Sequence, residues 1–444
     1  MKKTMFVIAL VFCLLAAMTT AFAVSGKGTQ DNPFRLSTPE ELLLLADFPA
    51  CHFELEKDIT FTGTWEPVAD FSGSLDGKGH TVTVSAYMAK TNTGFFGTLS
   101  GDVKNLTIYA NKITIESQGN AGVFAGRCSG SIQNCTALGE FACRSIGSNN
   151  ITLYSGGLCG ALSGKISHSK VNFTSLKYGT ATSNNRYLYG GGLCGVSDGT
   201  IEQCIHNSAV ILSRSYSDIV SYGGLTAKLN QDASISESLN VEISLKDTGS
   251  YTSYYAGITY ENKGTITNCY SASGKISGYG IANGGTMTNC FYDKTTIGSS
   301  STTCGTPKST LAMKMEMTYT DWDFENIWAI DESEENPING GYPYLQFFYE
   351  DIVRPITVST ASVSGEHIVI DTKITDVADT YVLHIALYDA DGRLCDYMML
   401  PNDRLLKDVF AVFADNDTAS YAKIFVWDAL NVIEPTADNH LFIN

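Results

Sequence analysis

The residues of this chain that could carry acid–base chemistry are few and scattered. Asp76 and His80 share the segment FSGSLDGKGHTV, residues 71–82, and a carboxylate close to an imidazole can move protons. Glycoside hydrolysis would instead need two carboxylates on one face of the fold. We interpret Asp76 as a turn residue and His80 as an exposed side chain, and we predict no catalytic residue. The acidic residues among the repeated phrases described below stand apart from one another: Asp198, Glu202, Glu237 and Glu242.

Motifs for metal-dependent chemistry are also missing from the sequence. It contains no His-Glu-x-x-His step and none of the Cys and His spacings typical of zinc sites. His168 and His206 fall inside the repeats, where we expect a polar, outward or loop position. The sequence therefore predicts neither a metal site nor a cofactor.

Tyrosines recur one to three residues before a glycine step in five of the repeated phrases. Their rings could simply stack on one another at the start of each strand, or they could line a face that binds a ligand. The segments between the phrases are rich in Tyr, Ser, Asn and Thr, which is typical of adaptable recognition surfaces, and aromatic rings suit the apolar faces of sugars. The candidate binding ladder consists of Tyr154, Tyr189, Tyr222, Tyr255 and Tyr279.

These tyrosines belong to a phrase that occurs seven times along the middle of the chain. A Gly-rich apolar step, clearest in two copies of GGLCG, is followed by Gly-x-Ile-x-x-Cys or a close variant. Copies lie between 23 residues (Gly257 to Gly280) and 35 residues (Gly157 to Gly192) apart, a period typical of stacked solenoids. One position three residues after the apolar one alternates between Leu, Cys and Ser. The apolar position itself repeats as Val103, Ile132, Ile166, Ile201, Ile235, Ile266 and Met287.

Alternation with a period near two, with Gly and Asn between the runs, predicts strands and turns rather than helices. Each phrase is too short to bury its own apolar face, so successive phrases must stack as rungs. We predict an all-β fold, a right-handed parallel β-helix over residues 24–348. Its cap and first rungs occupy 24–92, the repeats 93–293 and a closing segment 294–348. Thr38, Pro39 and Glu41 predict a short capping helix at the open N-terminal end.

On these motifs the chain resembles bacterial extracellular β-helix proteins that carry the GLUG motif, a group with pectin-lyase-like and adhesin-like members. The matching features are an entry segment at 28–41, the FSGSLDGKGHT turn, the GGLCG phrases and the closing NGGYPYL at 339–345. The resemblance spans residues 26–348. It implies a secreted or surface-attached protein, adhesin-like or accessory to larger surface enzymes, and it supplies no catalytic residues. Departures such as GLTA at Gly224 and GITY at Gly257 weaken single rungs.

The pattern changes after Leu345. Residues 355–444 contain four stretches with strand-like alternation, at 367–371, 381–388, 409–413 and 423–427, and Asp389–Gly392 is a hairpin signal. We predict a small immunoglobulin- or fibronectin-like β-sandwich there. Residues 422–429 also resemble a C-terminal module found on secreted proteins of Gram-positive anaerobes.

The first 23 residues have the pattern of a secretory signal peptide, with Lys2, Lys3, an apolar run at 5–17 and an Ala-x-Ala site ending at Ala23. Its removal changes the formal charge from −17 to near −19 (−17 minus 2). Such acidity disfavours nucleic acid and anionic membranes as partners. No second apolar span of sufficient length follows, so we predict an extracellular or cell-surface protein without membrane insertion after cleavage.

Cysteine use allows two interpretations. The chain has 12 cysteines, and removing Cys13 with the signal peptide leaves eleven, an odd number. Because Cys alternates with Ser at one repeat position, we interpret most as buried, reduced thiols that act as small apolar fillers. A bridge between neighbouring rungs, such as Cys159 to Cys194, remains the alternative for an exported protein.

Together these patterns predict a non-enzymatic recognition protein, and the resemblance implies that it is adhesin-like and of bacterial origin. Its partner would be a glycan or a surface protein, bound through the loop face of the β-helix. Two alternatives stay open: a polysaccharide lyase or glycoside hydrolase on the same fold, and a passive surface spacer. Convergence of two carboxylates from different rungs in one groove would distinguish the enzyme from the recognition protein.

Overall fold

A computed structural model describes most of the chain. The described residues are 24–117, 119–145, 151–180, 186–214, 218–242, 244–249, 253–274, 278–298, 303–331, 337–349 and the strands of the C-terminal part between 356 and 442. The predicted signal peptide with Cys13 lies outside them, as do residues 350–355, which precede the first strand of the C-terminal part. The chain divides into two compact units, Met1–Trp322 and Asp323–Asn444, so both units share the predicted closing segment 294–348.

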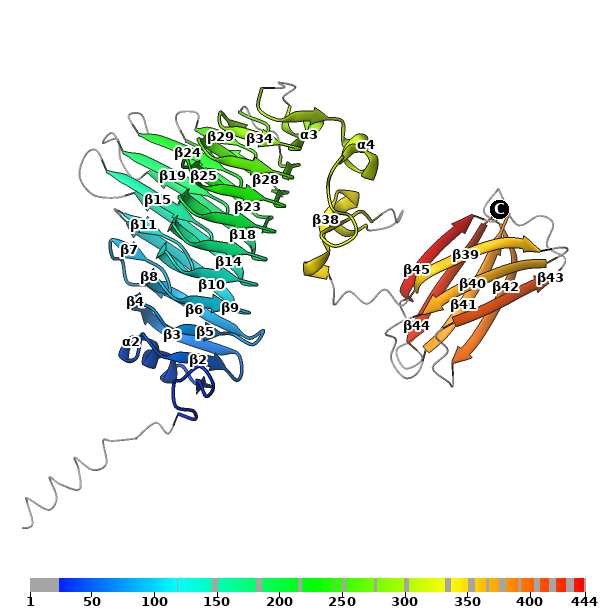
Figure 1. Cartoon of the computed structure of the whole chain (residues 1–444), viewed down its shortest axis with the longest axis horizontal. Helices are drawn as coiled ribbons and strands as arrows, with labels where there is room; N and C mark the ends of the chain where they lie inside the picture. The colour runs from blue at the N-terminus through cyan, green and yellow to red at the C-terminus, as the bar shows by residue number, and fades with distance from the viewer. Residues whose placement is uncertain are drawn as a thin grey trace, which may run out of the picture. The chain divides into compact units, whose positions relative to one another are not determined.

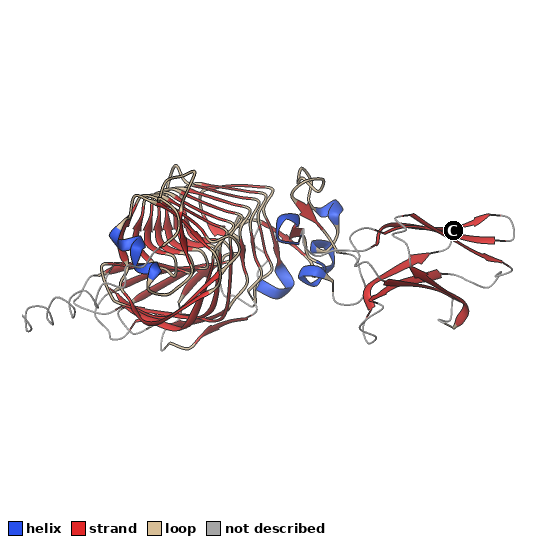
Figure 2. Cartoon of the chain, turned by 90° about the horizontal axis from the view of Figure 1, so that it is seen from below, coloured by secondary structure: helices blue, strands red, loops and turns tan. Residues whose placement is uncertain are grey.

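The first unit is a parallel β-solenoid, in which strands from successive rungs pair in four long sheets (Figure 1). Seen from below, the strands of the rungs follow one another around a common coil (Figure 2). The ten-stranded sheet contains, in order, β1 (Phe34–Leu36), β2 (His52–Leu55), β5 (Ser74–Asp76), β9 (Asp102–Lys104), β13 (Ser131–Gln133), β17 (Lys165–Ser167), β21 (Thr200–Glu202), β26 (Ser234–Ser236), β31 (Thr265–Thr267) and β34 (Thr286–Thr288).

The twelve-stranded sheet runs beside it through every rung. It contains β3 (Ile59–Trp65), β6 (Thr81–Tyr87), β10 (Thr107–Ser117), β14 (Thr136–Ser145), β18 (Lys170–Thr180), β22 (Ile205–His206), β27 (Leu239–Asn240), β32 (Tyr270–Ser271), β35 (Phe291–Asp293) and β36 (Thr306–Lys308), with β23 (Ala209–Ser213) and β28 (Ser244–Asp247) branching from β18.

The glycine-rich steps join the two remaining sheets of the solenoid. The six-stranded sheet contains β7 (Asn92–Thr93), β11 (Asn120–Ala121), β15 (Thr152–Gly156), β19 (Tyr187–Gly191), β24 (Ile219–Gly223) and β29 (Tyr254–Ala256). The eight-stranded sheet contains β4 (Val68–Phe71), β8 (Phe96–Leu99), β12 (Ala125–Cys128), β16 (Cys159–Leu162), β20 (Cys194–Ser197), β25 (Thr226–Leu229), β30 (Thr259–Asn262) and β33 (Ala282–Asn283).

The predicted helix at the N-terminal end is confirmed as a 3₁₀ turn, η1 (Glu41–Leu43), that continues into α2 (Leu44–Asp47). Its first turn is held by a reciprocal capping box. The Glu41 N–H donates to Thr38 Oγ1 at 3.3 Å, and the Glu41 carboxylate accepts the Thr38 N–H at 3.1 Å. Leu42 and Leu45 are buried, so this helix buries its apolar side at the start of the solenoid. Among its described residues, the solenoid unit also contains the short helices α3 (Lys294–Ile297), α4 (Thr310–Met313) and η2 (Glu316–Thr318).

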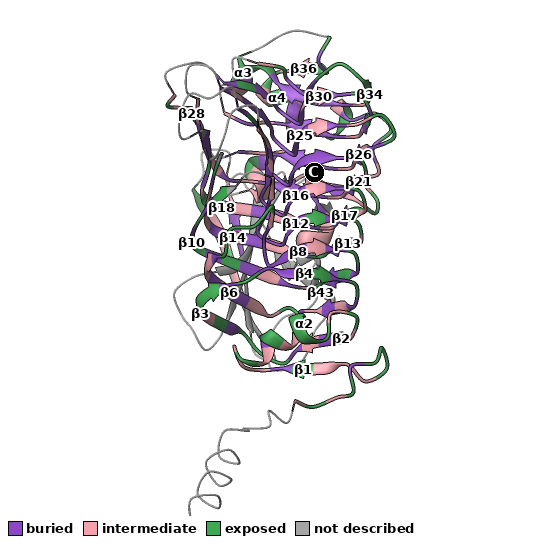
Figure 3. Cartoon of the chain, turned by 90° about the vertical axis from the view of Figure 1, so that its left-hand side faces the viewer, coloured by how far each residue is buried: buried purple, intermediate pink, exposed green. Residues whose placement is uncertain are grey.

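The predicted apolar register is confirmed. Ile132, Ile166 and Ile201 are direct partners on neighbouring strands of the ten-stranded sheet, and Val103, Ile235, Ile266 and Met287 continue the same column. The column is buried from Val103 to Ile266. Figure 3 shows buried and more exposed residues alternating along the rungs, which reflects the two-residue period of each strand.

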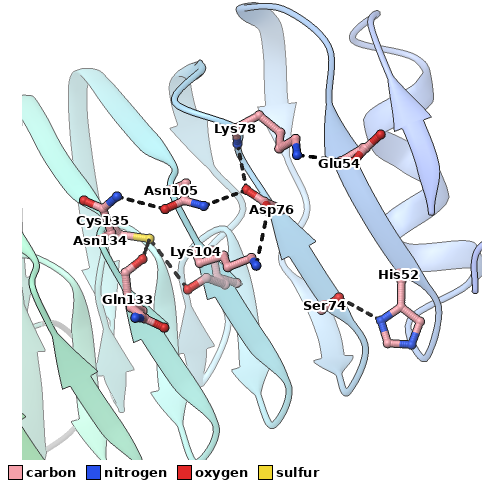
Figure 4. Close-up of polar contacts among 11 residues, drawn as sticks. His52, Glu54, Ser74, Asp76, Lys78, Lys104, Asn105, Gln133, Asn134 and Cys135 are labelled. Atoms are coloured by element: carbon pink, nitrogen blue, oxygen red, sulfur yellow. Dashed lines mark hydrogen bonds and ion pairs between the residues drawn. The ribbon is translucent and has the colours of Figure 1, made fainter. Parts of the chain in front are cut away.

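Between the ten- and twelve-stranded sheets, every repeat passes through one left-handed residue. These residues have φ between 46° and 53°, a conformation that Asn tolerates better than most residues. Their side chains bond along the solenoid: Asn134 Nδ2 donates to Asn105 Oδ1 at 2.8 Å, and Asn105 Nδ2 donates to Asp76 Oδ1 at 3.0 Å (Figure 4). The turn residues are Asn105, Asn134, His168, Gln203, Glu237, Asn268 and Asn289.

The residue after each left-handed turn explains the alternation of Cys and Ser. Where this residue is Cys or Ser, its side chain points inward and donates to the carbonyl oxygen two residues earlier, at 3.2 Å from Cys135 Sγ and 2.7 Å from Ser238 Oγ. Cys204, Cys269, Cys290 and Ser169 make the same bond. All eleven cysteines in the described part are free thiols, including Cys159 and Cys194, which face each other in register on β16 and β20.

The second unit begins with a short pairing of β37 (Trp328–Ala329) with β38 (Tyr344–Leu345), alongside η3 (Ile338–Gly341) and η4 (Gln346–Tyr349). Two antiparallel sheets follow. One contains β39 (Ile356–Ser364), β40 (His367–Ile374) and β43 (Asp408–Ala414), and the other β42 (Leu394–Asn402), β41 (Tyr381–Tyr388), β44 (Tyr421–Asp428) and β45 (Pro435–Phe442).

All four strands predicted in this region are present. β41 and β42 pair antiparallel on either side of the predicted hairpin signal, and Asp389 N–H donates to Arg393 O at 2.9 Å. Residues 390–392 of that signal lie outside the described residues. The immunoglobulin- or fibronectin-like assignment stays a prediction.

Replacing Ser238 tests the turn cap. Ser238 Oγ donates to Ser236 O and also accepts the Cys204 N–H at 3.0 Å. Ser238→Ala removes both bonds inside the core, and we expect a loss of ~1–3 kcal/mol in the free energy of unfolding, measured by chemical denaturation. Ser238→Cys keeps a donor that other repeats use at this position and should lose less than half as much. Equal losses in the two variants would contradict a capping role.

Candidate functional site

Asp76 and His80 engage different partners. Asp76 Oδ1 accepts the Lys78 N–H at 2.9 Å besides the Asn105 amide, and Lys104 Nζ lies 3.5 Å from Oδ2. Partial burial opposes ionisation of Asp76, but the hydrogen bonds from Asn105 and Lys78 outweigh it and lower its pKa. His80 Nδ1 lies 3.3 Å from Asp58 Oδ1, on the exposed side of the turn. The turn interpretation of Asp76 is confirmed, because Lys78 and the next residue adopt positive φ there.

Two carboxylates from neighbouring rungs do lie side by side, at Glu54 on β2 and Asp76 on β5. Both are bound by cations. Arg35 Nε lies 2.8 Å from Glu54 Oε1. Lys78 Nζ lies 3.9 Å from Glu54 Oε2, and Lys104 pairs with Asp76 (Figure 4). A general acid in glycoside hydrolysis needs a raised pKa. The pKa of Asp76 is shifted in the opposite direction. Since Glu54 and Asp76 are both held by Arg or Lys, we interpret the pair as structural.

The other acidic residues considered from the sequence also have separate partners. Asp198 accepts from Asn230 Nδ2 at 2.7 Å. Glu202 pairs with Lys165 at 2.7 Å, and Glu237 accepts from Asn268 Nδ2 at 2.6 Å. Glu242 is buried inside the solenoid. They do not form a common cluster.

The two histidines of the repeats have different positions. His168 occupies a left-handed turn with φ 49°, as expected of a loop position. The outward position expected for His206 is wrong, because this residue is fully buried. On β22 it is in register with Val171 of β18, a buried position of the twelve-stranded sheet.

The five predicted tyrosines do not form one ladder. Tyr189 of β19 pairs with Tyr154 of β15 on one side and with Ser221 of β24 on the other. Tyr222 therefore lies one residue beyond that register, and a one-residue offset turns a side chain to the opposite face of a strand. Tyr222 and its partner Tyr255 point inward, with exposed fractions of 1% and 8%. The prediction that Tyr222 and Tyr255 belong to an exposed binding ladder is therefore wrong.

Tyr154 and Tyr189 are outward, but their rings already have partners. The two rings stack with centroids 5.4 Å apart and an interplanar angle of 24°. Lys228 Nζ lies 5.7 Å from the Tyr189 ring centroid, and the Tyr189 hydroxyl donates to Glu261 Oε1 at 3.2 Å. Lys228 and Glu261 in turn lie 3.5 Å apart. Burial, then the Glu261 charge, raises the pKa of Tyr189, so this ring connects several rungs as a neutral phenol.

A more open aromatic cluster lies at the C-terminal end of the same face. Tyr254 on β29 and Tyr260 on β30 have ring centroids 5.6 Å apart, and Tyr260 and Tyr279 have centroids 6.1 Å apart. Tyr254 is 42% exposed and Tyr279 is 37% exposed. Arg214 lies 5.2 Å over the Tyr254 ring. We call Tyr254, Tyr260 and Tyr279 the tyrosine platform.

Two platform residues, Tyr254 and Tyr260, were missed from the sequence, which contained a signal for Tyr260 only. Tyr260 stands at the position that the last glycine of the regular step occupies, such as Gly195 in GGLCG, so the irregular GITY phrase marks it. A Cβ added at Gly195 would lie 2.4 Å from Ser155 N, which shows how closely two strands approach there. Tyr254 was hidden by its neighbour Tyr255, because only the register tells which of the two faces outward.

The fold defines this chain as a parallel β-solenoid protein, and comparisons with known proteins add little to that class. No protein-family model matches it. Over 148 residues, 29% of this chain, it is 28% identical to a Gly-rich membrane protein of Evansella cellulosilytica, of which it covers 17%. Over 139 residues, 26% of this chain, it is 28% identical to halomucin of Haloquadratum walsbyi, of which it covers 2%. The chain thus spans a small part of these relatives.

Among solved structures, the enzymatically active domain of tailspike protein 4 of bacteriophage CBA120 shows 13% identity over 90% of this chain and 66% of that one. The TM-score is 0.17, so no inference rests on this likeness. Among the helices of the described residues, none is long and apolar enough to cross a membrane. The described residues also hold no cluster of three or more His, Cys, Asp or Glu side chains suited to a metal ion.

Replacing one inward and one outward tyrosine by alanine tests the distinction between buried tyrosines and those of the tyrosine platform. Tyr222→Ala should lower the free energy of unfolding by ~3–5 kcal/mol, because it empties a buried aromatic site. Tyr254→Ala should change it by less than ~0.5 kcal/mol, as expected of a surface position. Chemical denaturation of both variants beside the wild type gives the comparison. A stability loss for Tyr254→Ala as large as that for Tyr222→Ala would assign the platform a structural role.

Proposed function

We propose that this protein is exported and recognises glycans at a surface through the tyrosine platform, without catalysing a reaction. The observation that carries the proposal is the cluster in which Tyr260, itself half-buried, contacts the exposed rings of Tyr254 and Tyr279. Apolar faces of sugar rings pack on aromatic rings, and the hydroxyl groups of tyrosine bind the sugar hydroxyls. A rigid solenoid holds such rings in place before the ligand arrives, which lowers the entropy cost of binding.

The rest of the same face can supply polar contacts. Lys228 and Glu261 lie on β25 and β30, next to each other across the eight-stranded sheet. They form an ion pair 3.5 Å long, and Glu261 is the residue after Tyr260 of the platform. Charged and amide groups beside aromatic rings orient a sugar by hydrogen bonds to its hydroxyls.

Export is supported by the sequence of residues 1–23, which has the features of a signal peptide. A formal charge near −19 (−17 minus 2) after its removal disfavours binding to anionic lipids or nucleic acid. A location outside the cell, free or held at a surface, fits the proposed recognition of glycans.

The enzyme alternative has less support from the geometry. Among the carboxylates considered, Glu54 and Asp76 are the pair from adjacent rungs, and both are bound by Lys or Arg. A passive spacer would need no exposed aromatic cluster. We therefore place recognition first and the enzyme second.

A glycan array probed with residues 24–444 tests the proposal. The variant Tyr254→Ala/Tyr260→Ala/Tyr279→Ala should bind at least about tenfold more weakly than the wild type, since each aromatic contact contributes ~0.5–1.5 kcal/mol. Tyr109→Ala is the matched control, because Tyr109 is 42% exposed on β10 in a different sheet. It should bind like the wild type.

The same array, assayed for released fragments, separates the alternatives. Binding without release supports recognition, and release of oligosaccharides would overturn the non-catalytic assignment. Unchanged binding by the triple variant would place the binding surface elsewhere. No binding and no release would favour a spacer or a protein partner.

A further inference from the structure

An unusual row of polar side chains runs through the interior of the solenoid. In the first rungs, one buried column of the twelve-stranded sheet is aliphatic: Ile59, Val82, Ile108, Ala137 and Val171. In the next rungs the same column continues as His206, Asn240 and Ser271, all fully buried. Buried polar groups are costly unless they are hydrogen-bonded, so this change of chemistry needs an explanation.

His206 and Asn240 form the centre of this row. His206 Nδ1 lies 2.8 Å from Asn240 Oδ1, and Asn240 Nδ2 donates to Gly257 O at 2.8 Å. The amide orientation makes Asn240 Oδ1 an acceptor, so His206 Nδ1 carries a hydrogen. The backbone of the glycine step closes over the ring, because a Cβ added at Gly192 would lie 2.4 Å from His206 Cγ.

Glu242 adds a carboxyl group to the same interior. It is 5% exposed, and its Oε1 is bonded by the Tyr222 hydroxyl of β24 and lies 3.9 Å from His206 Nδ1. His206 Nε2 and Glu242 Oε2 make no hydrogen bond in the described part of the chain. A charged imidazole or carboxylate with an unbonded atom would be strongly disfavoured at this depth.

The groups that face Glu242 are neutral or able to become so. They are His206 from β22, Asn240 from β27 and Tyr222 from β24, whose ring centroid lies 6.0 Å from that of Tyr178 of β18. Within the described residues, the ion-pair neighbour of Glu242 is His206. Strong desolvation therefore acts on both members of the pair, and no Lys or Arg of that part of the chain compensates it.

We propose that His206 and Glu242 form a charge-neutral couple in the core, in which the carboxyl keeps its proton and the imidazole remains uncharged. In the unfolded chain the same two groups are an imidazolium and a carboxylate at mildly acidic pH. Folding thus moves one proton from the histidine to the glutamate. Within the mildly acidic pH range the pair therefore leaves the free energy of unfolding independent of pH. It changes that free energy only at the lower and upper ends of the range.

The linkage signs follow from the two shifts. Burial raises the pKa of Glu242 from 4.5 to about 7, so on its own this group makes the fold less stable as pH rises from 4.5 to 7. Burial lowers the pKa of His206 from 6.5 to about 4, so on its own it makes the fold more stable as pH rises from 4 to 6.5. Between about pH 4.5 and 6.5 the two opposite changes of the free energy of unfolding with pH cancel, because the pair holds the same number of protons in the folded and in the unfolded chain.

Single substitutions should reveal the two opposite dependences of the unfolding equilibrium constant on pH. With Glu242→Gln, His206 remains, and the unfolding equilibrium constant should fall about tenfold per pH unit between 4.5 and 6.5, relative to the wild type. With His206→Asn, which places the residue of the next rung in this column, the constant should rise about tenfold per pH unit over the same range. The double variant should run parallel to the wild type. Denaturation curves measured at half-unit pH steps give all four profiles.

Parallel profiles for all variants would overturn the proposal. Should a single variant fail to fold, the wild type labelled with ¹³C at the glutamate carboxyl carbons provides the second measurement. One carboxyl signal that titrates near pH 7 supports the couple. Titration of every glutamate below about pH 5.5 would overturn it. Neither measurement depends on glycan binding, so the result tests this proposal separately from the proposed function.

Discussion

The structure depends on one left-handed residue in each rung. Asn105, Asn134 and their equivalents turn the chain from the ten-stranded to the twelve-stranded sheet at a φ near 50°. Where the next residue is Cys or Ser, its side chain donates to the carbonyl oxygen two residues earlier. Because the turn recurs at the same position, each strand meets the same strand of the next rung. Every core column then stacks on itself, and the main-chain groups of one rung bond to those of its neighbours.

The turn also accounts for the cysteines. Leu106 occupies the inner corner of the first repeat, and in the other six repeats a small Cys or Ser there donates a hydrogen bond to the carbonyl oxygen two residues earlier. Ser does this through its hydroxyl and Cys through its thiol, as Ser169 and Cys204 show. Burial raises the pKa of Cys204 to about 12, so its sulfur remains a protonated thiol at neutral pH. The cysteines of the turn are therefore structural groups.

The side chains with distinctive chemistry occur where the sequence departs from the repeat. Where the aliphatic column gives way to His206 and Asn240, the core contains titratable groups. Where Tyr260 replaces the glycine of the step, a ring stands on the surface beside Tyr254 and Tyr279. A repeat that stacks through its backbone tolerates such changes, because each rung is held by its neighbours as well as by its own side chains.

The sequence by itself determined the solenoid, the register of the isoleucine column, the capping box at Thr38 and Glu41, and the strands of the second unit. These features depend on periodicity and local turn chemistry, which are properties of neighbouring residues. Only the tertiary structure decided which face each tyrosine occupies. Tyr254 and Tyr255 are adjacent and chemically identical, and the pairing with Ser221 and Tyr222 alone turns one outward and the other inward. The same holds for His206 and Glu242, since burial and contact between rungs are set by stacking across more than thirty residues of chain.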